Sequence, residues 1–191
     1  MSSGTTGAGG VAVAVGIVVT EGRIDLISRL GGSNLLSSSR ATLARAEVTQ
    51  ISTDMAWASV QDLGLPVLLH DPLCPLLAAS VLAGAVADSV TGRIIVGCRP
   101  VTDTIKVVTG GRVGQSVDRD LLVEIASPIV LPPHVVATLT DWPDTADFAL
   151  LVTSLREQFP VRFVEVPALG RRVDDESALS VLTAVDELRQ R

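Results

Sequence analysis

The chain has 191 residues, of which 47% are hydrophobic and only 3% aromatic, and its formal net charge is −6. This length suits one domain with one core, and that core must consist mainly of aliphatic side chains. Aliphatic cores are typical of α/β folds, in which parallel strands are buried on both faces. The negative charge and the lack of a basic stripe argue against a nucleic-acid partner.

No sequence feature indicates a membrane or an oxidising compartment. The longest apolar run, residues 11–19, is too short for a membrane span, and no basic residue precedes it. The two cysteines, Cys74 and Cys98, lack the spacing of metal ligands, which favours two buried thiols over a disulfide or a metal site. We therefore expect a cytoplasmic protein with no membrane partner.

The first part of the chain alternates between strand and helix patterns. Residues 1–10 are rich in Ser, Gly and Thr and are expected to be a disordered tail, which leaves residues 11–191 as a single domain. The hydrophobic periodicity predicts, in chain order, a strand at 11–20, a helix at 35–46, the end of a helix at 59–63, a strand at 66–70, a helix at 76–87 and a strand at 93–98.

A more polar, alternating segment follows residue 99. Gly110 and Gly111 separate two strand-like pieces within it, which is a hairpin signal. We expect this hairpin to protrude from the main sheet as an arm of about residues 100–126. The remaining pattern predicts a helix at 135–139, a helix at 147–159, a strand at 161–166 and a helix at 176–189. The element order predicts an α/β sandwich with one excursion.

Three segments resemble motifs of a known family, in the family's order. They are LLHDPLCPL at 68–76, PVTDTIK at 100–106, and SVDR at 116–119 with ASP at 126–128. Weaker matches are LGGSNLL at 30–36 and GRRV at 170–173. On these motifs the chain resembles the 2-C-methyl-D-erythritol 4-phosphate cytidylyltransferases, which join CTP to methylerythritol phosphate. The resemblance implies a Rossmann-like, three-layer α/β/α nucleotidyltransferase fold, a homodimer formed through the hairpin arm, and CTP or a sugar phosphate as ligand.

Asp71 is the candidate metal ligand. It ends the predicted strand at 66–70, and open α/β sheets bind ligands at the carboxyl ends of their strands. A carboxylate there suits Mg²⁺, and the resemblance matches Asp71 to the family's Mg²⁺ ligand. The alternative is that Asp71 caps the following helical turn. The histidine before it, His70, is expected to be structural.

The resemblance also assigns residues to the substrate, namely Thr104, Lys106, Arg119, Ser127 and Arg172. Thr104 and Arg119 match arm residues that hold the methylerythritol phosphate across the dimer, which suits a hydroxyl and a guanidinium. Ser127 keeps the hydroxyl of the family's threonine, and Arg172 replaces a substrate-side lysine. The alternative for Arg119 is an ion pair with a neighbouring aspartate, and for Lys106 a solvent-facing charge.

The loop after the first strand departs from the family. Active members carry a Gly-rich loop whose amides, arginine and lysine hold the triphosphate. Here the loop contains Glu21 and Asp25, and Arg23 is its only candidate cation. No lysine precedes Lys106, and Cys74 replaces the arginine of the family's "HDaaRP" motif. Acidic groups beside a triphosphate would repel it.

These departures favour a divergent, non-catalytic homologue that acts as a binding or regulatory dimer. The alternative is an active nucleotidyltransferase that makes CDP-methylerythritol or a related CDP-alcohol, with Arg23 or Arg29 as the cation of a rearranged loop. Whether the chain is an enzyme therefore depends on that loop. Fold likeness alone is a weak warrant for either function.

Overall fold

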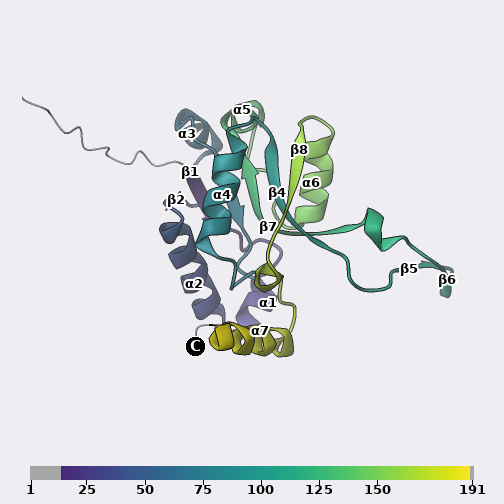
Figure 1. Ribbon diagram of the computed structural model, residues 1–191. Coiled ribbons are helices and arrows are strands. Elements are labelled where there is room, and N and C mark those ends of the chain that lie inside the picture. The colour runs from purple at the N-terminus through teal and green to yellow at the C-terminus, as the bar shows by residue number, and fades with distance from the viewer. Residues whose placement is uncertain (1–13, 190–191) are drawn as a thin grey trace, which may run out of the picture.

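A six-stranded sheet forms the centre of the computed structural model, which describes residues 14–189 (Figure 1). The strands lie in the order β2-β1-β3-β7-β4-β8, and β7 runs antiparallel to both of its neighbours in an otherwise parallel sheet. Their bounds are β1 Ala14–Val18, β2 Val48–Gln50, β3 Val67–His70, β4 Ile94–Pro100, β7 Val123–Leu131 and β8 Val161–Glu165.

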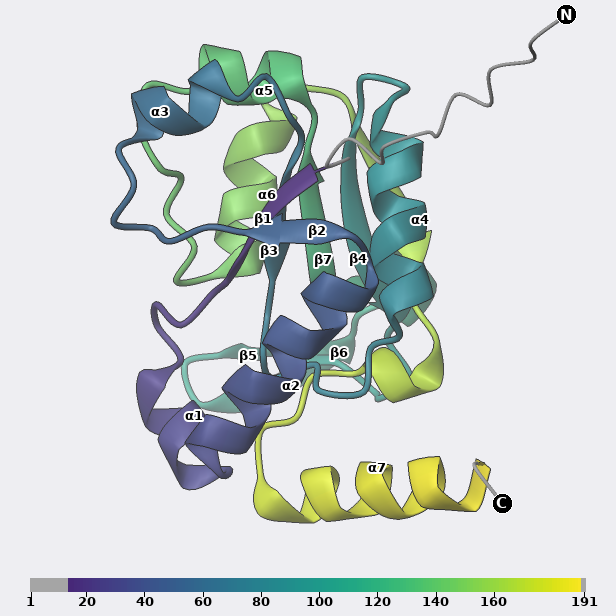
Figure 2. The same ribbon diagram turned by 90° about the vertical axis from the view of Figure 1, so that its left-hand side faces the viewer.

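Helices cover both faces of the sheet (Figure 2). One face carries α2 (Gly32–Arg45) and α4 (Ala79–Ser89), and the other carries α3 (Trp57–Asp62), α5 (Pro133–Thr138) and α6 (Phe148–Arg156). Two further helices, α1 (Ile24–Arg29) and α7 (Glu176–Arg189), pack together in a smaller apolar cluster with the start of α2. No helix within residues 14–189 combines the length and the apolar character that a membrane span requires.

Alternation along the strands explains the two layers of helices. In β3, Val67 and Leu69 point into the core shared with α3, α5 and α6, whereas Leu68 points into the core shared with α2 and α4. All three side chains are fully buried. Because successive side chains of a strand face opposite sides, a strand buried on both faces must read as a continuous aliphatic run. The predicted three-layer α/β/α fold is thus confirmed.

Most predicted elements are present, with shifted ends. The strands expected at 66–70, 93–98 and 161–166 and the helices expected at 35–46, 76–87, 135–139, 147–159 and 176–189 correspond to β3, β4, β8, α2, α4, α5, α6 and α7. The helix end expected at 59–63 belongs to α3. The strand expected at 11–20 is β1 over Ala14–Val18, whereas residues 11–13 and the expected tail at 1–10 lie outside the described residues.

One α-helix, α1, and two strands, β2 and, most importantly, β7, were not predicted. Proline is unusual in a central strand, and Pro128 lies in the middle of β7. The ladder accommodates it by a bulge, because Val96 pairs with Ile129 while Cys98 pairs with Ile125. Since β7 begins at Val123, residues 123–126 of the expected arm lie in the main sheet.

The hairpin arm itself is formed by β5 (Lys106–Thr109) and β6 (Arg112–Ser116), which pair only with each other. Gly110 and Gly111 join them with φ of 57° and 75°, the left-handed values that a two-residue type I′ turn requires. Every residue of both strands is exposed. The arm projects away from the body of the molecule (Figure 1), as expected from its polar alternation.

A buried histidine ends β3 and links it to β7. His70 is 1% exposed, and its Nδ1 lies 2.7 Å from Oγ of Ser127. Oγ of Ser127 also accepts a hydrogen bond from the backbone N–H of Asp71. Burial lowers the pKa of His70 to about 4, against a smaller raising effect of the Asp71 carboxylate. The imidazole is therefore neutral in the folded protein at neutral pH, as a structural residue should be.

Because His70 is buried in its neutral form, we expect the protein to be less stable in mild acid than at neutral pH. The unfolded chain gains a proton on His70 as the pH falls through about 6.5, but the folded chain does not until about pH 4. The stability that depends on a neutral His70 is therefore fully present above pH 6.5. Between pH 7.5 and pH 5 the free energy of unfolding should drop by about 2 kcal/mol. Urea denaturation at pH 7.5 and pH 5 measures this drop. A His70→Gln variant should show a clearly smaller drop, and an equal drop in that variant would refute the assignment.

Gly97 predicts a second stability effect. A Cβ at this position would lie 2.7 Å from the carbonyl carbon of Ser127 and 3.0 Å from the nitrogen of Pro128, both backbone atoms of the bulge. Gly97→Ala should therefore lower the free energy of unfolding by roughly 3 kcal/mol. The matched control is Gly84→Ala in α4, where a Cβ meets nothing within 4 Å. That control should stabilise by about 0.5–1 kcal/mol. Equal denaturation midpoints for the two variants would contradict the close approach of β4 and β7.

Candidate functional site

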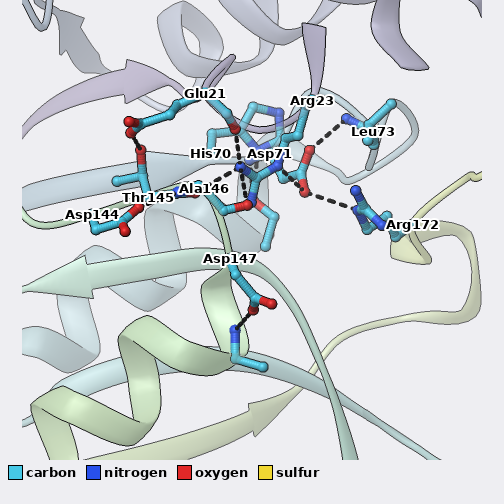
Figure 3. A network of polar contacts seen from close by, with 12 residues as sticks. Glu21, Arg23, His70, Asp71, Leu73, Asp144, Thr145, Ala146, Asp147 and Arg172 are labelled. Carbon is cyan, nitrogen blue, oxygen red and sulfur yellow. Dashed lines mark hydrogen bonds and ion pairs between the residues drawn. The ribbon is translucent and has the colours of Figure 1, made fainter. Parts of the chain in front are cut away.

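Asp71 follows directly after β3, at the carboxyl end of a central strand. Its side chain is 3% exposed, and both carboxylate oxygens accept hydrogen bonds (Figure 3). Oδ1 accepts from the backbone N–H of Leu73 at 2.9 Å, and Oδ2 accepts from Nε of Arg23 at 2.9 Å and Nε of Arg172 at 3.2 Å. The carboxylate thus closes a local turn, whereas the next helix, α4, begins only at Ala79.

Arg23 is the main partner of Asp71. It lies in the turn between β1 and α1, and its side chain is also 3% exposed. Its Nη1 donates to the carbonyl oxygens of Glu21 at 2.7 Å, Thr145 at 2.7 Å and Ala146 at 3.3 Å. Its guanidinium carbon lies 4.6 Å from the ring centroid of Phe148, a cation–π distance. Arg23 therefore joins the turn after β1, the end of β3 and the loop before α6.

A second contact joins the turn after β1 to the loop before α6. Oγ1 of Thr145 donates to Oε2 of Glu21 at 2.9 Å. Between Glu21 and Arg23, Gly22 adopts φ 67°, and a Cβ there would meet Ala146 at 2.8–3.0 Å. We call residues 21–23 with residues 145–146 the bridge. It connects the turn after β1 to the loop before α6.

Two pockets flank the bridge. The large pocket, of about 1090 Å³, lies at the carboxyl ends of β1 and β2, and Glu21, Gly22 and Thr145 line its bridge side. The second, of about 400 Å³, is lined by Arg23 and Ala146 and holds the ion-paired carboxylate, so we call it the Asp71 pocket. The two pockets have no lining residue in common. The bridge thus separates them.

Ser127, a predicted substrate residue, lies behind this surface. It is fully buried, and its hydroxyl is used by His70 and by the backbone of Asp71. It lines neither the large pocket nor the Asp71 pocket. Its position therefore supports Asp71 from within the core. Arg172, by contrast, lines the Asp71 pocket with 38% of its side chain exposed.

The predicted arm residues lie elsewhere. Thr104, Lys106 and Arg119 are all exposed. Nη1 of Arg119 donates to the carbonyl of Thr102 at 2.9 Å, and among the described residues the side chain forms no ion pair with Asp118 or Asp120. Arg119 lines a third pocket of about 310 Å³ at the base of the arm. Within one chain the structure brings Arg23, Asp71, Ser127 and Arg172 together, and leaves the arm residues apart.

Sequence reasoning missed the loop before α6. This loop bonds Arg23 through the carbonyl oxygens of Thr145 and Ala146, and it bonds Glu21 through the hydroxyl of Thr145. A backbone group carries no residue-type signal, and a single threonine carries little. Asp147 offered a recognisable signal, because an acid at a helix start is a typical cap. Its Oδ1 accepts from the backbone N–H groups of Ala149 at 2.7 Å and Leu150 at 3.1 Å. Glu124, on β7, was hidden by the failure to predict that strand.

The residues around Asp71 do not fit a Mg²⁺ site. Mg²⁺ requires free oxygen ligands, but both oxygens of Asp71 are engaged and two guanidinium groups share Oδ2. Cys74 adds no ligand, because burial, with a further contribution from Asp71, raises its thiol pKa to about 12. Over residues 14–189, no group of three or more His, Cys, Asp or Glu side chains could hold a metal ion.

Comparison with known proteins identifies the fold. No protein-family model matches the chain, and no curated protein is similar to it in sequence. Among solved structures, it is similar to the 4-diphosphocytidyl-2C-methyl-D-erythritol synthase of Anaerococcus prevotii, with a TM-score of 0.63, 14% identity and coverage of 92% of this chain and 99% of that one.

Two further solved cytidylyltransferase structures are similar to this chain. The 2-C-methyl-D-erythritol 4-phosphate cytidylyltransferase of Thermus thermophilus matches with a TM-score of 0.63 and 20% identity, over 93% of this chain and 100% of that one. The enzyme of Francisella tularensis matches with a TM-score of 0.58 and 13% identity, over 89% and 98%. This chain therefore has the nucleotidyltransferase fold of these cytidylyltransferases across most of its length.

Proposed function

We propose that this protein is a non-catalytic, ligand-binding homologue of the methylerythritol phosphate cytidylyltransferases. In this proposal it acts in the cytoplasm as a dimer that binds or regulates, and it does not transfer a nucleotidyl group. The observation that carries the proposal is the bridge, in which Arg23 is bonded to Asp71 and to three carbonyl groups.

The first argument is geometric. Nucleotidyl transfer needs the acceptor oxygen within about 3–3.5 Å of the reacting phosphorus, with the two groups in line. The bridge lies between the large pocket and the Asp71 pocket, which have no lining residue in common. A nucleotide in one pocket and an acceptor in the other would therefore be held apart.

The second argument is electrostatic. A triphosphate needs cations and oriented donors, which supply much of the catalytic stabilisation. The charged residues that line the large pocket are Glu21 and Arg40, and Arg40 is an exposed side chain on α2. Arg23 faces the other pocket, and the only lysine of the chain, Lys106, lies on the arm. The large pocket thus offers a triphosphate little compensation for its charge.

The alternative, an active nucleotidyltransferase that makes CDP-methylerythritol or a related CDP-alcohol, requires a new cation in the large pocket. Arg29 does not line that pocket. Arg23 would have to leave a carboxylate and three carbonyls that are buried or partly buried, and groups left without partners in such places cost several kcal/mol. The closed bridge therefore favours the non-catalytic function.

The arm supports a dimer. Apolar side chains are exposed along it, namely Ile105, Val107, Val108, Val113 and Leu121. A lone two-stranded hairpin is marginal in water, and an exposed apolar patch of this kind marks an interaction surface. We propose that a second copy covers it. In such a dimer, the resemblance implies that Thr104 and Arg119 of one arm contact a sugar phosphate bound to the other protomer. Lys106 would lie near the same ligand.

A turnover assay tests the loss of catalysis. The purified chain, given CTP, methylerythritol phosphate and Mg²⁺, should release pyrophosphate at the background rate. The Thermus thermophilus cytidylyltransferase, assayed in parallel, provides the positive control. Pyrophosphate release that follows the chain through successive purification steps, and that is abolished by Arg23→Gln, would overturn the proposal in favour of the active alternative.

A stability measurement tests the role of Arg23. Arg23→Gln should lower the free energy of unfolding by about 3 kcal/mol, because it leaves a buried carboxylate and several carbonyls short of partners. Arg40→Gln is the matched control, an exposed arginine of the large pocket, and should change stability by less than about 0.5 kcal/mol. Urea denaturation at pH 7.5 compares them. If the two variants unfold at the same urea concentration, the bridge is not structural.

A further inference from the structure

The Asp71 pocket carries charges of both signs. Arg23 and Arg172 line it, and both bond Oδ2 of Asp71 (Figure 3). Glu124 from β7 and Asp147 from the start of α6 also line it. Counting Asp71, the pocket is lined by two arginines and three carboxylates, a formal sum of −1. A ligand of this pocket therefore meets both guanidinium and carboxylate groups.

The arginines keep unused donors. Nη2 of Arg23 forms no hydrogen bond within residues 14–189, although the side chain is 97% buried. The only fully buried side-chain polar atom left without a partner in that range is Oγ of Ser39, so Nη2 of Arg23 is not sealed inside the protein. Because Arg23 lines the Asp71 pocket, that pocket gives access to Nη2. Arg172 bonds Asp71 through Nε alone. Together the two side chains offer guanidinium donors to an anionic group.

The carboxylates keep unused acceptors. Glu124 is exposed and forms no ion pair or side-chain hydrogen bond with any described residue. Asp147 uses only Oδ1 to cap α6, which leaves Oδ2 available. Apolar side chains complete the lining: Val123, Ile125, Ala146, Phe148 and Ala149. A pocket that offers guanidinium donors, carboxylate acceptors and an apolar lining fits a molecule with an anionic end, a short carbon chain and an ammonium end.

We propose that the Asp71 pocket binds a small zwitterion, with its anionic group on Arg23 and Arg172 and its ammonium group on Glu124 and Asp147. A free phosphate would meet two carboxylates without compensation, and a free amine would meet two guanidinium groups. The proposal deepens the proposed function and rests on it in one respect, because Arg23 must stay on Asp71 for its Nη2 to be available here.

Calorimetry on the full chain tests this. Phosphoethanolamine and γ-aminobutyrate are the zwitterionic probes, with phosphate and carboxylate as their respective anionic ends. Inorganic phosphate and ethanolamine are the probes that carry charge of one sign only. At least one zwitterion should bind about fivefold or more tightly than either inorganic phosphate or ethanolamine. This is the effect expected when one more pair of opposite charges forms near a protein surface. No preference for a zwitterion, or no binding of any probe, would overturn the proposal.

Two single-residue variants test whether Glu124 binds the ammonium group of the ligand. Glu124→Gln should weaken the preferred zwitterion about fivefold and strengthen inorganic phosphate, since it removes one repulsive charge. Glu157→Gln, an exposed acid beyond the far end of α6, should change neither. Equal affinity of the Glu124→Gln and wild-type proteins for the zwitterion would refute the role of Glu124. The outcome is separable from the proposed function, because pyrophosphate release would refute the loss of catalysis whatever the zwitterion affinity.

Discussion

The ion pair between Arg23 and Asp71 is the interaction on which the rest of the site depends. Moving two charges out of water is costly, and their attraction offsets that cost only when the remaining donors and acceptors are also satisfied. Here Asp71 accepts from Leu73 and Arg172 as well, while Arg23 donates to three carbonyls and lies against Phe148. Those requirements hold the turn after β1 against the loop before α6.

The same pair sets the chemical character of both pockets. Because Arg23 is turned toward Asp71, the large pocket at the ends of β1 and β2 keeps Glu21 without that cation. On the other side, Arg23 and Arg172 concentrate positive charge around one carboxylate, so Glu124 and Asp147 are left as the free acids of the Asp71 pocket. One arrangement therefore keeps the Arg23 cation out of the large pocket and gives the Asp71 pocket charges of both signs. Both pockets lie within a nucleotidyltransferase fold.

Local sequence signals predicted what depends on local physics. Aliphatic runs identified β3 and β4, Gly110 and Gly111 identified the hairpin, and the end of the predicted strand placed Asp71 at the carboxyl edge of the sheet. The strand β7 was missed because Pro128 argues against a central strand, and only the pairing with β4 reveals the bulge that accommodates it. The missed strand also concealed that Ser127 points inward to His70. The partnership of Arg23 and Asp71 joins residues 48 positions apart, so no local pattern contains it.

Two departures from the cytidylyltransferase motifs then have a single physical explanation. The resembling motif has an arginine where this chain has Cys74, whose buried neutral thiol cannot compensate the nearby Asp71 carboxylate. A buried carboxylate without a cation would be strongly destabilising. Arg23 and Arg172, which are 48 and 101 residues distant from Asp71 in the chain, supply that charge. In the proposed function, the loop after β1 offers no cation to a triphosphate because Arg23 is bonded to Asp71.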